Sequence, residues 1–121
     1  MTAPLPFFLA IVVFASTISF PAEATEFPAF QGEFCTEVAK QPIKPADRFL
    51  ALIQCNRSEN RFKEQLQKHW FLVTDDDMKF CMKSKGTMDE IKSYQQLMGC
   101  LSSIVGQKCY SGTLTCRGKT L

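Results

Sequence analysis

The stretch that decides the fold is residues 87–106, which read TMDEIKSYQQLMGCLSSIVG. Its apolar residues recur every three or four positions, so on a helix they form a stripe about 140° wide. That stripe consists of Ile91, Tyr94, Leu97, Met98, Leu101, Ile104 and Val105. Thr87 and Glu90 have the spacing of a capping box, and Gly106 is typical of a residue just past a helix end. The sequence therefore predicts an amphipathic helix over about 88–105.

Two further helices are predicted upstream, over about 46–55 and 57–73. On a helix of 100° per residue, each has an apolar face suited to a core. The first face holds Ala46, Phe49, Leu50, Leu52 and Ile53; the second holds Phe62, Leu66, Trp70 and Val73. The polar run at 56–60 favours a break between the two helices, and a single long helix is the alternative.

A fourth helix is predicted over about 75–85, before Gly86. Thr74 can cap it, and Asp75–Asp77 complement the positive end of its dipole. Calcium loops space their carboxylates at alternate positions and include a glycine, a pattern absent here. We therefore interpret the three aspartates as residues of a helix start, and no metal or cofactor is predicted.

The first 24 residues read MTAPLPFFLAIVVFASTISFPAEA. An apolar core followed by small residues is typical of a signal peptide, here cut after Ala24. Pro21 and Glu23 end the apolar run too early for a transmembrane helix. We expect an exported protein, extracellular or periplasmic if the source is Gram-negative. After cleavage the domain, 25–121, should have no stable membrane insertion.

All six cysteines lie in the predicted mature chain: Cys35, Cys55, Cys81, Cys100, Cys109 and Cys116. An even number in a short exported chain predicts three disulfides, and the intervals do not match the paired spacing of zinc sites. Cys109–Cys116 is the most plausible local pair. Cys81–Cys100 is disfavoured, because a helical hairpin turning at Gly86 would offset them by about 13 Å. The other pairings stay open.

These patterns together predict an all-α fold: one small domain of about four helices joined by three disulfides. Prolines and glycine punctuate residues 25–45, so an irregular lead-in is expected there, with one turn near 37–40. An irregular loop is expected after Gly106.

The sequence contains no recognisable set of catalytic residues. His69 is the only histidine, and no serine stands in a G-x-S-x-G context. The predicted mature chain has fourteen Lys and Arg against eleven Asp and Glu, once Glu23 is set aside. That balance is too mild to indicate nucleic acid as a partner. Asn56 begins a short glycosylation sequon, which is a weak signal.

The most informative polar feature is the outer side of the predicted helix 57–73. Arg57, Arg61 and Lys68 fall within about 40° of one another, and Phe71 joins them if the helix continues past Trp70. Cations beside an exposed aromatic are typical of a protein-binding surface. We therefore expect a non-enzymatic binding protein that acts on another protein, as an inhibitor, immunity-type protein, effector or signalling factor. The alternative is a carrier of a small apolar ligand in a cavity between helices.

Overall fold

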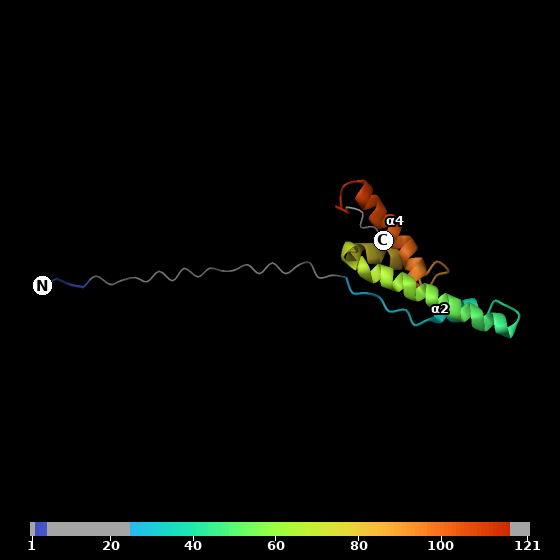
Figure 1. The fold of residues 1–121 in the computed structure, drawn as a ribbon. Coiled ribbons are helices and arrows are strands. Elements are labelled where there is room, and N and C mark those ends of the chain that lie inside the picture. Colours follow the sequence, from blue (N-terminus) through green and yellow to red (C-terminus); the bar gives the residue numbers. More distant parts are fainter. Residues whose placement is uncertain (1, 5–24, 117–121) are drawn as a thin grey trace.

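The computed structural model describes residues 2–4 and 25–116, and Figure 1 shows its fold. The described residues form four α-helices and one short 3₁₀ helix: α1 (Glu33–Ala39), α2 (Pro45–Lys68), η1 (Trp70–Leu72), α3 (Asp75–Met82) and α4 (Tyr94–Tyr110). No strand occurs in these ranges, and the predicted all-α class is confirmed. The apolar core of the predicted signal peptide lies outside the described residues.

α2 is one continuous helix, so the predicted break within it is wrong. Pro45 stands in its first turn, where the N–H that proline lacks would have no helical partner. The polar run at 56–60 contains neither glycine nor proline and continues the helix. Ser58 accepts a hydrogen bond from Arg61 at 3.3 Å, and Glu59 reaches the start of α4. With 24 residues, α2 is about 36 Å long.

α4 begins at Tyr94, six residues later than predicted. Its N-cap is Ser93, whose hydroxyl oxygen accepts a hydrogen bond from the Gln96 N–H at 3.1 Å. The Glu59 carboxylate of α2 accepts hydrogen bonds from the N–H groups of Tyr94 (2.8 Å) and Gln95 (3.2 Å). These bonds satisfy three of the four N–H groups that a helix start leaves without internal partners. A residue of another helix therefore helps to decide where α4 starts.

The predicted capping box of this helix belongs instead to the loop 83–93. The Thr87 hydroxyl donates to the Ser84 carbonyl at 2.6 Å, and the Glu90 carboxylate accepts the Gly86 N–H at 3.0 Å. Gly86 has a φ of +82°, a left-handed conformation that favours glycine. These contacts make a structured loop between α3 and α4 in place of the tight helical turn expected at Gly86.

The hydrophobic core lies between the C-terminal half of α2, η1, α3 and α4. Its buried members are Leu66, Trp70, Val73, Cys81, Tyr94, Leu97, Met98 and Leu101. Most come from the apolar stripes predicted for 57–73 and 88–105. Phe27 and Phe30 pack against this cluster, and the Tyr94 hydroxyl donates to the Pro28 carbonyl at 3.0 Å. The irregular segment 25–32 is therefore part of the packed domain.

α1 takes the place of the single turn expected near 37–40. It begins after Gly32, whose φ of +78° turns the chain into the helix. α1 packs against α2 in what we call the α1–α2 hairpin, which Figure 1 shows extending away from α4.

Three disulfides join neighbouring elements: Cys35–Cys55, Cys81–Cys100 and Cys109–Cys116. Cys109–Cys116 is the pair that the sequence favoured. Cys81–Cys100, which the sequence disfavoured, is formed with its Cα atoms 6.0 Å apart. The prediction was wrong because it assumed that both helices run up to Gly86. α3 ends at Met82 instead, and the loop 83–93 removes the fixed register of a tight hairpin.

Candidate functional site on the solvent face of α2

The three cations predicted for the site lie on one continuous helix. Arg57, Arg61 and Lys68 are all exposed, on the side of α2 opposite the buried Leu66. Because no break interrupts α2, their spacing of four and seven residues keeps them close to one line along the helix. We call these three residues the basic row.

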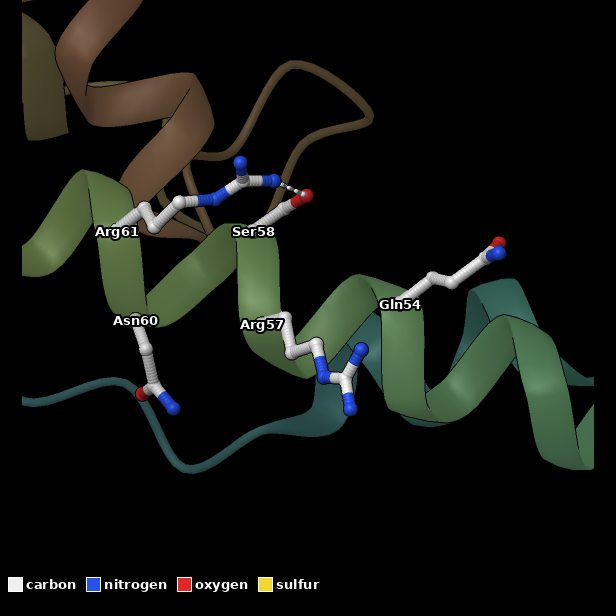
Figure 2. A pocket seen from close by; sticks show the side chains of 5 residues that line it. All are labelled: Gln54, Arg57, Ser58, Asn60 and Arg61. Atoms are coloured by element: carbon white, nitrogen blue, oxygen red, sulfur yellow. Dashed lines mark hydrogen bonds between the residues drawn. The ribbon is translucent and has the colours of Figure 1, made fainter.

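A hollow of about 700 Å³ opens along this part of α2. Figure 2 shows the five side chains that line it: Gln54, Arg57, Ser58, Asn60 and Arg61. Arg61 bends toward Ser58, whereas Arg57 and Asn60 extend from the other side of the helix in this view. Two guanidinium groups and two amides offer many hydrogen-bond donors here, which suits carboxylates or backbone carbonyls of a partner.

Phe71 would continue the basic row only if α2 ran past Trp70, and it does not. α2 ends at Lys68, and the His69 N–H bonds back to the Leu66 carbonyl at 3.2 Å. Phe71 lies in η1 and is 63% exposed, with its ring centre 6.5 Å from that of His69. It is thus an exposed aromatic next to the end of the basic row, held there by the 3₁₀ turn.

Exposed apolar side chains lie at the N-terminal end of α2 and in the loop just before it. Ile43 is 90% exposed, Phe49 67% and Leu50 52%. We call these three residues the apolar tip. The helical wheel assigned Phe49 and Leu50 to a buried face, but neither belongs to the core cluster.

The apolar tip is structured and borders a second hollow. The Arg48 side chain donates to the Pro42 carbonyl at 2.6 Å, which ties the loop before α2 to its first turns. The hollow, about 390 Å³, opens between α1 and α2 and is lined by Thr36, Ala39, Lys40, Arg48, Phe49 and Leu52. An apolar side chain of a partner could enter it beside Phe49.

Leu50 of the apolar tip shares the solvent face of α2 with the basic row. At 100° per residue, Leu50 lies within about 20° of Arg57, Arg61 and Lys68 around the helix axis. At 1.5 Å per residue, Arg57 and Arg61 lie about 10 and 16 Å farther along it. The face is therefore divided into an apolar end and a cationic end.

The aspartate cluster has a structural role. Asp77 is buried and forms a capping box with Thr74. Its carboxylate also accepts a hydrogen bond from the Lys108 ammonium at 2.7 Å, which joins α3 to α4. Burial alone would raise the pKa of Asp77, but the hydrogen bonds from Lys108 and Thr74 outweigh it, so the pKa lies below its ordinary value.

The single histidine and two of the methionines occupy structural positions among the described residues. His69 is the C-cap of α2, and its Nδ1 atom is buried with no hydrogen-bond partner among the described residues. Met78 and Met82 pack against the core. Within residues 2–4 and 25–116, no three His, Cys, Asp or Glu side chains are grouped so that they could hold a metal ion.

Comparison with known proteins gives no relative: the chain matches no family model, no curated protein and no solved structure. Among the described residues, none of the helices is both long enough and apolar enough to span a lipid bilayer. Functional inference therefore rests on the surfaces just described.

Proposed function

We propose that this chain is an exported protein that acts by binding another protein, and that the solvent face of α2 is its interface. The observation that carries the proposal is the apolar tip: three large apolar side chains, all within residues 43–50 of a structured hairpin, are exposed. Contiguous apolar groups on a soluble domain commonly mark an interaction surface. The basic row predicted from the sequence supports the same face.

The division of this face indicates the chemistry of the partner. The apolar tip needs a groove lined by apolar side chains, in which Phe49 and Leu50 lose contact with water. Arg57 and Arg61 need carboxylates or carbonyls placed about 10 to 16 Å farther along the helix. The partner would thus have an apolar groove with acidic residues beyond one end.

A protein suits the apolar tip better than a membrane does. Lys44, Asp47 and Arg48 are exposed around Ile43 and Phe49. Insertion of the tip into a bilayer would carry these charges toward the hydrocarbon, at a high cost in solvation free energy. A protein groove can instead leave them at a wet, polar rim.

Export is part of the same proposal. Its support is the apolar leader followed by small residues in the sequence, together with three disulfides that leave no cysteine free. Such bridges persist in oxidising compartments outside the cytosol. An inhibitor, an immunity-type protein, an effector and a signalling factor all fit a stable exported domain that works through one face.

The test begins with a photo-crosslinking phenylalanine analogue at position 50, used to identify the protein that contacts the tip in its native medium. Affinity for the purified partner is then measured for Phe49→Ser/Leu50→Ser and for Arg57→Ala/Arg61→Ala. Because interface residues at hot spots cost about 2 kcal/mol or more each, we expect each double variant to bind at least about 100-fold more weakly.

The matched control is Met88→Ser/Tyr110→Ser, which removes two highly exposed side chains from other parts of the surface. It should bind like the wild type, and all three variants should keep their melting temperatures within a few degrees. The proposal fails if the control loses as much affinity as the tip variant, or if the tip variant binds normally.

A further inference from the structure

A third hollow, beside α2, has the composition of a small-ligand site. It measures about 360 Å³ and lies where segment 30–35, α2 and the start of α4 meet. Lys63, which lines it, is about 140° around the helix from Leu50, so this pocket is separate from the apolar tip. Ligand pockets commonly measure 300–1,000 Å³, so its occupant would be small.

Aromatic rings form one wall of this pocket. Phe30, Phe34 and Tyr94 all line it. Phe30 and Tyr94 meet edge to face, with ring centres 4.8 Å apart, and the Tyr94 hydroxyl is held by the Pro28 carbonyl. Such a wall is fixed before any ligand arrives. The Tyr94 ring is buried and stacked on Phe27, so the half-buried rings of Phe30 and Phe34 offer the apolar surface to a planar group.

The charged side chains around the pocket differ in whether other groups of the protein already bind them. Glu59 lines it, but both of its carboxylate oxygens accept N–H groups at the positive end of α4. Lys63 is half-buried, with its ammonium 5.8 Å from the centre of the Tyr94 ring. Neither Lys63 nor Lys92, the other lining lysine, has a carboxylate within 4.0 Å in the described part of the chain. The pocket thus presents two lysines that form no ion pair in the described residues, beside one carboxylate that is already bound to the start of α4.

From this arrangement we infer that the pocket binds a small organic carboxylate with a planar apolar body. The ammonium groups of Lys63 and Lys92 bind the carboxylate, and the amide of Asn60 can donate to it as well. The planar body packs against Phe30 and Phe34. This activity would be additional to protein binding and does not depend on it.

The experiment uses the full, disulfide-bonded mature protein with 1-naphthoate and its neutral counterpart 1-naphthalenemethanol as probes. Isothermal titration should show one naphthoate bound per chain, with a Kd below about 1 mM. Amide NMR shifts should be largest at Phe34, Asn60 and Tyr94. The alcohol should bind at least about tenfold more weakly, since it offers the lysines no charge.

Two double variants separate a specific site from general attraction. Lys63→Gln/Lys92→Gln should weaken naphthoate binding at least about tenfold, since each lysine supplies a charged hydrogen bond. Lys79→Gln/Lys85→Gln removes the same charge from exposed positions elsewhere and should bind as the wild type does. The inference is overturned if naphthoate does not saturate, if the alcohol binds equally well, or if both double variants behave alike. Circular dichroism confirms that each variant is folded.

Discussion

The hydrogen bonds from α4 to Glu59 predict a large effect of one side chain on stability. Glu59→Ala removes the acceptor of the Tyr94 and Gln95 N–H groups at 2.8 and 3.2 Å. A hydrogen bond to a charged group contributes about 1.5–3 kcal/mol, and loss of a helix N-cap about 1 kcal/mol. Water can replace the acceptor at the exposed Gln95 but not fully at the buried Tyr94. We therefore expect the free energy of unfolding to fall by about 2–3 kcal/mol.

The measurement is urea unfolding of the disulfide-bonded protein, followed by circular dichroism. For a domain of this size the loss corresponds to roughly 10–20 °C in melting temperature. Glu64→Ala is the control, because Glu64 is exposed on the outer side of the same helix. It should change the free energy of unfolding by no more than about 0.5 kcal/mol. Equal effects of Glu59→Ala and Glu64→Ala would refute the idea that α2 caps α4.

Two further predictions concern α3 and the disulfides. The pKa of Asp77 lies below 3.8, so its carboxylate stabilises the fold above about pH 4, and that contribution is lost as the pH falls through the folded-state pKa. Asp77→Asn should therefore show a shallower fall in the free energy of unfolding between pH 5 and pH 3 than the wild type; equal slopes would contradict this. Replacing both cysteines of Cys81–Cys100 by serine should cost more than the same change at Cys109–Cys116. Loop entropy alone makes the two losses of unfolding free energy differ by about 1 kcal/mol, because the closed loops span 19 and 7 residues. Calorimetry of both variants shows which one is less stable.

Local sequence patterns were sufficient to predict the class of the fold and most of the residues of its core. The stripe that ends at Val73 and the one that begins near Tyr94 are amphipathic on their own, and both are buried in the structure. The capping role of Thr74 was also visible, because its partner Asp77 is only three residues away. Features that depend on neighbours along the chain were predictable from helical periodicity and capping rules.

The errors around the start of α4 involve contacts between distant residues. The run at 56–60 looked like a break because Glu59 is polar, yet its partners stand 35 and 36 residues away on α4. Thr87 was predicted to cap the helix 88–105, but the N-cap is Ser93, beside the two N–H groups that bond to Glu59. The Cys81–Cys100 pair was disfavoured because the sequence could not show where α3 ends.

The candidate site was predicted in part. The basic row required only that α2 be helical through Arg57 and Lys68, and it is. The apolar tip was missed because a helical wheel shows that Phe49 and Leu50 share a side but not whether anything covers that side. Burial depends on what the rest of the chain supplies, and α1 is too short to cover them.

The continuity of α2 connects the architecture to the proposed function. Leu50 stands at the exposed end and Leu66 is buried in the core, 16 residues or about 24 Å apart on one helix. Each disulfide joins neighbouring elements, and Cys35–Cys55 lies wholly within the α1–α2 hairpin. The orientation of the apolar tip is therefore set by α2 itself and by the Glu59 contact with α4. A hinge near residue 56 would let the tip move independently of the core, and binding would then carry the entropy cost of fixing it. An unbroken helix removes that cost in advance, which favours the protein binding that we propose for this face.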